Sequence, residues 1–286
     1  MQRVARPRHY LMCPPTHFAV TYAINPWMDP DAGVDVELAL VQWTTLADAY
    51  RMLGHRVDTI TPVEGLPDMV FAANGAVVID GIALGSRFRH PERAAEADHY
   101  ADWLRANGFP RVHLPEHTIE GEGDLLVSDD VVLAGTGFRT DVAAHRWVAD
   151  VTGREVVSLE LVDPRYYHLD TALCVLDRTT IAYLPEAFSD AGREELARRY
   201  PDAVLVHPDD AAILACNAVS DGRNVVIPAG TTRFADDLAD RGFSPIEVDL
   251  SELLKAGGGP KCCTLEIRPV PAVAEGRDDV AQEVPA

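Results

Sequence analysis

The stretch IEGEGDLLVSDDVVLAGTGFRTDVAAHRWVADVTGREVVSLELV, residues 119–162, contains one complete structural unit of this chain. Two apolar runs on either side of the Asp-Asp pair at 129–130 predict a β-hairpin, because aspartate favours tight turns. Residues 140–153 predict an amphipathic helix that ends at a glycine, and residues 154–162 predict a strand rich in valine and leucine. This order of elements is typical of an α/β fold.

The same order of helix, strand and hairpin recurs along the chain, as in repeat architectures. Further helices are expected at residues 44–54, 90–108, 189–201 and 231–242. The strands that follow them are expected at residues 56–63, 111–116, 202–209 and 244–250. Further hairpins are expected at residues 73–85, 170–183 and 217–230. A last hairpin begins at residue 262 but has no return strand, and the N-terminal segment YLMCPP, residues 10–15, is expected to supply it.

Each hairpin begins at a polar residue that could take part in chemistry. These residues are Asn74, Glu120, His168, Asn217 and Cys262, separated by 46, 48, 49 and 45 positions. If the units close around an axis, as radial repeats do, the five positions meet at one mouth and assemble an active site. We expect five pseudo-fivefold repeats, formed by residues 1–269 as a single catalytic domain. Residues 270–286 lack periodicity and are expected to be a mobile C-terminal tail.

The composition limits the classes of protein that the chain could represent. Its 286 residues are 47% hydrophobic, which is enough for a large globular core. A net charge of -20 argues against a nucleic-acid partner and suits a cationic substrate, although solubility alone explains the charge more simply. Because the sequence has neither a long apolar run nor a secretory signal, we expect a cytoplasmic protein without a membrane partner.

The five cysteines are odd in number and form no CxxC pair or zinc-type spacing. This pattern argues against a disulfide framework and a structural zinc, and no metal site is expected. We expect the thiols to be reduced.

Cys262 lies in GGGPKCCTLEIRP, where glycines allow a ligand to approach the backbone closely and Lys261 adds a positive charge. A cation lowers the pKa of a neighbouring thiol, so Cys262 is a candidate nucleophile, and the alternative is a buried structural cysteine. Cys263 would point to the opposite face of a strand and is interpreted as structural.

Other repeat starts supply acid–base and binding groups. His168 is a candidate general acid and base, although a lone histidine in a core is the common alternative. Glu120 and Asp170 are carboxylates that could accept paired hydrogen bonds from a guanidinium, whereas Glu122 is interpreted as a turn residue.

Two arginines suit the opposite end of an amino-acid substrate. Arg93 and Arg139 could hold a substrate carboxylate, or could be surface helix residues.

These residues resemble the guanidino-group-modifying enzymes, the pentein superfamily, which includes arginine deiminase, arginine dihydrolase, dimethylarginine dimethylaminohydrolase and the amidinotransferases. The resemblance covers residues 9–269. It rests on the motifs MCPPTHF, NPWM, LPDMVFAANGAVV, IEGEGDLLV, GFRTD, YYHLDT and GGGPKCCTLEIRP.

The resemblance implies a five-bladed α/β propeller with Cys262 as nucleophile, His168 as acid and base, and Glu120 as the acidic partner. It also implies substrate contacts from a further set of residues: Asn25, Asn74, Arg93, Arg139 and Asp170. It implies no metal or organic cofactor.

Two positions favour one substrate over another within the superfamily. Dimethylarginine enzymes usually carry HLK after their histidine, whereas this chain has His168-Leu169-Asp170. An ionised Asp170 would need N–H donors that a dimethylated nitrogen lacks. The segment FAANG, which contains Asn74, resembles the corresponding segment of the arginine dihydrolases. The amide of Asn74 could hold both a guanidinium and the ureido oxygen of citrulline.

The sequence therefore favours an arginine dihydrolase, which carries arginine through a covalent thiouronium to citrulline and then to ornithine, ammonia and carbon dioxide. Dimethylarginine dimethylaminohydrolase is the first alternative, and a deiminase that stops at citrulline is the next. An amidinotransferase, a non-catalytic ribosome-binding factor of the same fold and an arginine sensor are weaker alternatives. The expected partner is a small guanidino compound, and a homo-oligomer stays open.

Overall fold

The computed structural model describes residues 3–129 and 131–268, which form a mixed α/β fold. Its strands group into five three-stranded sheets. The sheets are β15 (Leu265–Glu266), β1 (His9–Met12) and β2 (Arg56–Thr59); β3 (Ala76–Ile79), β4 (Ile82–Gly85) and β5 (Val112–His113); β6 (Leu125–Ser128), β7 (Val131–Thr136) and β8 (Glu155–Glu160); β9 (Leu173–Val175), β10 (Ile181–Tyr183) and β11 (Val204–Leu205); and β12 (Val219–Ser220), β13 (Asn224–Pro228) and β14 (Ser244–Val248).

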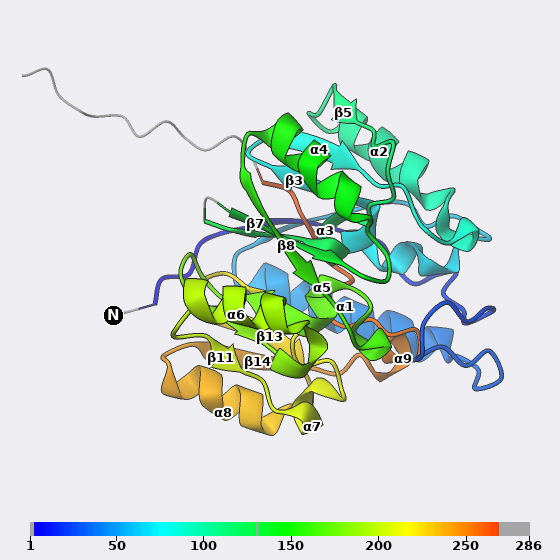
Figure 1. Cartoon of the computed structure of the whole chain (residues 1–286). Helices are drawn as coiled ribbons and strands as arrows, with labels where there is room; N and C mark the ends of the chain where they lie inside the picture. The colour runs from blue at the N-terminus through cyan, green and yellow to red at the C-terminus, as the bar shows by residue number, and fades with distance from the viewer. Residues whose placement is uncertain (1–2, 130, 269–286) are drawn as a thin grey trace, which may run out of the picture.

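Every sheet has the same internal topology. The first two strands pair antiparallel, and the second and third pair parallel. A helix crosses between the parallel strands, as a parallel connection requires. These helices are α1 (Val36–Met52), α2 (Glu96–Ala106), α4 (Val142–Thr152), α6 (Asp190–Arg199) and α8 (Thr232–Asp240), and they lie on the outside of the molecule (Figure 1). The predicted repeat of hairpin, helix and strand is thus confirmed.

The two ends of the described chain meet in one sheet. Strand β1 pairs antiparallel with β15, with Tyr10 opposite Glu266 and Leu11 opposite Leu265. It also pairs parallel with β2. The N-terminal segment therefore supplies the return strand of the last hairpin, as the sequence predicts.

Short helical turns lead into several hairpins, and the sequence did not predict them. Glu120 and His168 each precede one turn of helix, α3 (Gly121–Asp124) and α5 (Leu169–Ala172). The remaining short segments are α7 (Pro208–Ala211), α9 (Ser251–Leu254), η1 (Pro67–Val70), η2 (Ala72–Gly75), η3 (Pro91–Arg93), η4 (Pro164–Tyr166) and η5 (Pro185–Ala187). Because each helical turn bends the chain tightly, Glu120 and His168 lie at bends, and their side chains meet in a hydrogen bond.

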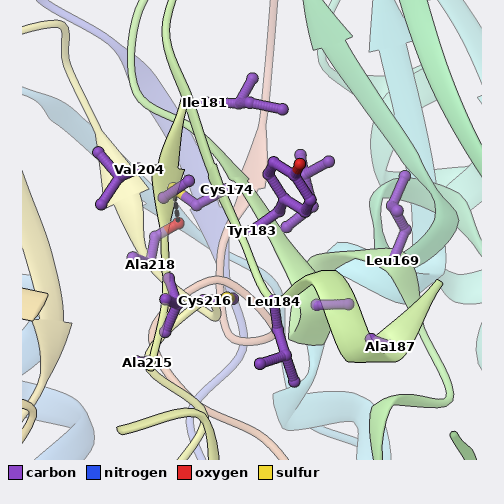
Figure 2. Close-up of a cluster of buried hydrophobic side chains, with 14 of the residues drawn as sticks. Leu169, Cys174, Ile181, Tyr183, Leu184, Ala187, Val204, Ala215, Cys216 and Ala218 are labelled. Carbon is purple, nitrogen blue, oxygen red and sulfur yellow. Dashed lines mark hydrogen bonds between the residues drawn. The ribbon is translucent and has the colours of Figure 1, made fainter. Parts of the chain in front are cut away.

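Apolar side chains fill the space between the sheets and their helices. One cluster contains Tyr183, Leu169 and two buried thiols, and Cys174 donates to the carbonyl of Ala218 at 3.3 Å (Figure 2). Cys216 lies in the same cluster. All five cysteines of the chain are free and buried.

Three sequence predictions need correction. Helix α1 begins at Val36 rather than residue 44, because the side chain of Asp35 accepts from Leu38 N at 2.9 Å and caps an earlier start. Strands β5 and β11 have two residues each, since prolines follow closely and cannot donate to a sheet. Cys262 lies in a turn ahead of β15 rather than at a strand start.

Parts of the chain fall outside the described residues. The tip residue Asp130 and the predicted tail at 270–286 are among them. Within residues 3–129 and 131–268, no helix combines the length and apolar character needed to cross a membrane.

Candidate active site

The five residues that begin the repeats meet at one place. All of them are almost completely buried: Asn74, Glu120, His168, Asn217 and Cys262. Gly123 lies between two of them, since a Cβ on this glycine would lie 2.3 Å from Asn74 Nδ2 and 3.2 Å from His168 Cγ. The backbone adds a further connection, from Ala73 N to Cys262 O at 3.0 Å.

His168 and Glu120 form a buried pair, with Nε2 and Oε2 2.7 Å apart. Arg139 Nη1 lies 3.1 Å from the same carboxylate oxygen, and Arg89 N donates to the other oxygen at 3.0 Å. Burial opposes ionisation, but the hydrogen bond from His168 and the charge of Arg139 hold the pKa of Glu120 well below its usual range. An ionised Glu120 accepts the Nε2 proton, and Nδ1 has no hydrogen-bond partner among residues 3–129 and 131–268.

The Cys262 thiol has one donor contact and one acceptor contact. Its Sγ donates to Asp170 Oδ2 at 3.3 Å and accepts from Asn217 Nδ2 at 3.0 Å. Burial, followed by the charge of Asp170, raises the pKa of Cys262 well above its usual value. The thiol is therefore neutral when no substrate cation is bound.

Lys261 does not activate Cys262 in the way the sequence predicts. Its Nζ donates to Glu122 Oε2 at 2.6 Å and to the carbonyl of Thr264 at 2.9 Å. Glu122 is fully buried and also pairs with Arg268, so its interpretation as a turn residue is wrong. Burial opposes its ionisation, yet Arg268 and Lys261 lower the pKa of Glu122, and the three side chains form an ion cluster of their own.

Asp170 combines full burial with an unpartnered oxygen. Burial raises its pKa to about 7, against the opposing charge of Lys261. Its Oδ2 contacts Cys262, whereas Oδ1 has no hydrogen-bond partner in the part of the chain that the structure describes. Asp170 is thus poised to ionise when a cation arrives.

Arg93 and Asn74 belong to a second buried network. The Arg93 guanidinium pairs with Glu96 at 2.8 Å, donates to Asn74 Oδ1 at 2.8 Å and contacts the carbonyl of Asp68 at 3.2 Å. With Oδ1 of Asn74 occupied, its Nδ2 remains unpartnered and buried. Asp68 Oδ1 is also unpartnered, and its Oδ2 accepts from the hydroxyl of Tyr22 at 2.9 Å.

The segment between β1 and α1 contacts the site from the outside. Arg139 Nη2 donates to the carbonyl of Ile24 at 2.9 Å, and its guanidinium lies over the Tyr167 ring at 4.6 Å. Asn25 uses its side chain on the backbone, donating to Ala256 O at 3.0 Å and accepting from Trp27 N at 2.9 Å. Asn25 therefore lies at the edge of the site, whereas Arg139 contacts Glu120 within it.

The structure brings together nearly all the predicted site residues and adds others. Asp68 lies in the quoted motif LPDMVFAANG, and Asn217 begins a repeat, but neither was assigned a role. The unpartnered buried atoms supply a signal that the sequence lacks. Around the site they are Asp68 Oδ1, Asn74 Nδ2, Asp124 Oδ2, His168 Nδ1 and Asp170 Oδ1. A group of carboxylate oxygens next to a thiol and an imidazole suits a planar cation.

Comparison of this chain with known proteins identifies the family to which it belongs. A profile described as "N,N dimethylarginine dimethylhydrolase, eukaryotic" matches residues 16–269. An N(G),N(G)-dimethylarginine dimethylaminohydrolase from Mycobacterium tuberculosis is 56% identical over 94% of this chain and 88% of its own. The bifunctional arginine dihydrolase/ornithine cyclodeaminase ArgZ from Synechocystis is 38% identical over 90% of this chain, which spans 37% of that longer protein.

Solved structures agree with the sequence matches. The N-terminal domain of ArgZ, an arginine dihydrolase, has been solved bound to substrate and, separately, covalently bound to a reaction intermediate. Both structures give a TM-score of 0.88 at 36% identity, over 92% of this chain and 99% of theirs.

The fold, the site and these relatives define a hydrolase of guanidino C–N bonds in the pentein superfamily, which confirms the predicted resemblance. Within that superfamily, the chain belongs to the dimethylarginine dimethylaminohydrolase family.

Proposed function

We propose that this chain hydrolyses asymmetric dimethylarginine to citrulline and dimethylamine. The observation that carries this choice of substrate is the 56% identity to the Mycobacterium tuberculosis dimethylaminohydrolase over 94% of the chain. The sequence ranked arginine dihydrolase first, and the comparisons support the dimethylarginine alternative better.

The argument from Asp170 against a methylated substrate does not hold on geometry. Asymmetric dimethylarginine retains its Nε–H and one unmethylated NH2, and with the dimethylated nitrogen cis to Cδ it presents both along one edge. That edge offers donors to unpartnered oxygens such as Asp170 Oδ1 and Asp68 Oδ1. The methylated nitrogen then needs no acceptor.

Cys262 is the proposed nucleophile. A guanidinium held by Asp170 places a positive charge near Sγ, which offsets the burial that otherwise keeps the thiol protonated. The thiol passes its proton to Nδ1 of His168, the thiolate attacks the guanidinium carbon, and a C–S bond forms. The ArgZ domain structure with a covalently bound intermediate supports a covalent route.

His168 is the proposed acid and base. Its Nδ1 delivers a proton to the departing dimethylamine as the C–N bond breaks and a thiouronium forms. The neutral imidazole then takes a proton from the attacking water. Collapse of that adduct breaks the C–S bond, returns the hydroxyl proton of the adduct to the Cys262 sulfur and releases citrulline, while Glu120 holds the imidazole through Nε2. The imidazolium then releases its extra proton to solvent.

Arg93 and Arg139 are proposed to serve the carboxylate end of the substrate, with Asn25 as an outer contact. Arg139 supports this role because it bridges Glu120 and the outer segment at Ile24. Arg93 is bound more firmly to protein groups.

The five sheets are proposed to surround a common axis as the blades of an α/β propeller, with residues 1–269 forming one domain. Their identical topology and the meeting of the five repeat starts support this arrangement.

Arginine dihydrolase is the second candidate, and one observation favours it. Asn74 Oδ1 already accepts from Arg93, whereas its Nδ2 donor has no partner among the described residues and is open to a ligand. A donor suits the ureido oxygen of citrulline, which a dihydrolase must bind for its second cycle.

One experiment separates the candidates: the protein is incubated with asymmetric dimethylarginine, arginine or citrulline, and the products are identified by mass spectrometry. Dimethylamine with citrulline, formed at a higher kcat/KM than any product of arginine, is the expected result. Ornithine from arginine with little turnover of dimethylarginine would overturn the proposed substrate. Cys262→Ser is expected to abolish turnover, whereas the neighbouring Cys263→Ala is expected to retain it.

A further inference from the structure

Asn217 makes more contacts with the nucleophile than any other side chain described above. Its Oδ1 accepts from Cys262 N at 3.0 Å and from Gly259 N at 3.1 Å. Its Nδ2 donates to Cys262 Sγ at 3.0 Å and to the backbone carbonyl of Asp170 at 3.1 Å. The side chain is fully buried. One amide therefore connects the nucleophile, its loop and the segment that carries Asp170.

These contacts use the complete hydrogen-bonding capacity of an amide, which is two donors and two acceptor sites. They also fix which end is oxygen, because two backbone N–H groups from Gly259 and Cys262 require an acceptor at Oδ1. The orientation of Nδ2 toward Sγ is thus determined by the backbone and not by the thiol.

The surrounding backbone is shaped to hold this amide. Leu214 is fully buried with φ +60°, a strained conformation for a residue with a side chain, and its carbonyl accepts from Asn217 N at 2.8 Å. On the other side, a Cβ on Gly259 would lie 2.9 Å from Asn217 Oδ1. Strain that persists at one position and a glycine required at another both indicate selection for geometry.

We propose that Asn217 is a positioning residue, which fixes the place of Cys262 Sγ relative to Asp170, the carboxylate that grips the guanidinium. This inference rests on the proposed function, because it assumes that Cys262 attacks a carbon held by Asp170.

The chemical consequence is alignment and stabilisation of the thiolate. The N–H of Asn217 keeps a hydrogen bond to Sγ after the thiol proton has gone, and hydrogen bonding to a charged form favours that form. Misplacement of a reacting atom by about 1 Å costs on the order of a hundredfold in rate. Loss of the amide should therefore lower kcat far more than it raises KM.

Two substitutions separate this role from simple support of the loop. Asn217→Asp keeps an oxygen for Gly259 N and Cys262 N but replaces the N–H donors with an acceptor. We expect kcat to fall on the order of a hundredfold, with KM changed by less than about threefold. Asn217→Ala removes both sets of contacts and should show a similar loss in kcat. Far-UV circular dichroism and thermal unfolding check that each variant folds, and Asn217→Asp carries the test if Asn217→Ala does not.

Alkylation of Cys262 by iodoacetamide gives a readout that needs no substrate. The rate is measured against pH, and the modified cysteine is identified by mass spectrometry. Because both variants lose the N–H donor to Sγ, we expect their alkylation profiles to move to higher pH than that of the unmodified sequence. Asn107→Asp is the matched control, since its exposed amide also donates to a backbone carbonyl, that of Trp103 at 2.8 Å. It should leave kcat and the alkylation profile unchanged.

An Asn217→Asp variant with the original kcat and alkylation profile would overturn the inference, because support of the loop through Oδ1 would then suffice. That result is distinct from failure of the proposed function. If Cys262→Ser retained turnover, the nucleophile itself would be wrong, whatever the Asn217 variants showed.

Discussion

Asp170 shows how one buried carboxyl couples stability to function. Its pKa is raised from an unfolded value near 3.8 to about 7 by burial. Between these two pH values the folded chain holds a proton that the unfolded chain has lost, so stability contributed by the neutral form falls as pH rises from about 4 to about 7. The cost of keeping this group for catalysis is thus largest at neutral pH.

Asp170→Asn should remove that cost. We expect Asp170→Asn to be stabilised relative to the unmodified sequence more at pH 8 than at pH 5. The difference between the free energies of unfolding of the two proteins should grow by roughly 3 kcal/mol between these pH values. Urea unfolding at the two pH values measures it, and turnover should be lost. The exposed Asp202→Asn is the control, and an equal pH dependence of all three proteins would contradict the prediction.

Glu120→Gln should separate charge from shape. Glutamine can still accept from His168 Nε2, but it brings no negative charge to the imidazole or to Arg139. Because general acid–base catalysis depends on the protonated imidazole, we expect kcat to fall on the order of a hundredfold, with a smaller change in KM. The exposed Glu116→Gln on the same loop should behave like the unmodified sequence. Full activity of Glu120→Gln would rule out this role for the carboxylate charge.

For single residues, the sequence pointed to candidate site residues by their position in the repeat. It did not show which side chains they pair with. That approach singled out Cys262, His168 and Glu120, and the structure places all three among the buried repeat starts. It misjudged Lys261 and Glu122, which pair with each other across 139 positions of sequence. Such pairing depends on side-chain directions that no local pattern records.

Glycines show what an element permits at each position. Gly192 lies in α6, where an added Cβ would make only ordinary contacts, the nearest at 3.5 Å. Gly258 precedes the nucleophile, and an added Cβ would lie 2.1 Å from the Phe71 ring. The same substitution should therefore have opposite effects in the two elements.

Gly192→Ala should raise the free energy of unfolding by about 0.5–1 kcal/mol, since alanine loses less backbone entropy in a helix, and should leave turnover unchanged. Gly258→Ala should lower both stability and kcat, because the aromatic ring or the nucleophile loop must move. Chemical denaturation and steady-state kinetics measure both variants. A loop that accepted alanine without loss would contradict the close packing described above.

Element types were predicted well and element boundaries less well. Alternating and helical apolar patterns identified the five long helices and most strands, because the patterns reflect burial on one face. The early start of α1 depends on a single capping aspartate, Asp35, and the one-turn helices α3 and α5 are too short to show a period. Boundaries of this kind follow from individual hydrogen bonds.

The whole molecule carries a net charge of -20, and its proposed substrate is a cation. A negative field concentrates cations near the protein, and salt screens it over about 10 Å at 0.1 M ionic strength. We expect kcat/KM for asymmetric dimethylarginine to fall several-fold between about 0.01 M and 0.3 M salt, through KM rather than kcat. Inhibition by citrulline, which has no net charge, is the control and should change less. A kcat/KM independent of salt would show that the charge serves solubility alone.

The repeat explains why the architecture could be predicted from one chain, since five similar units constrain one another. The substrate could not be fixed in the same way, because it depends on the protonation of Asp170 and on which atoms of Asn74 are already engaged.

The pairing of β1 with β15 also has a consequence for synthesis of the chain. A ribosome makes β1 more than 250 residues before β15, so this sheet stays incomplete until Cys262 has emerged. A nascent chain that stops early can pair β1 with β2, but the other edge of β1 stays open and Cys262 is missing. Assembly of the last sheet and completion of the catalytic centre are therefore the same event.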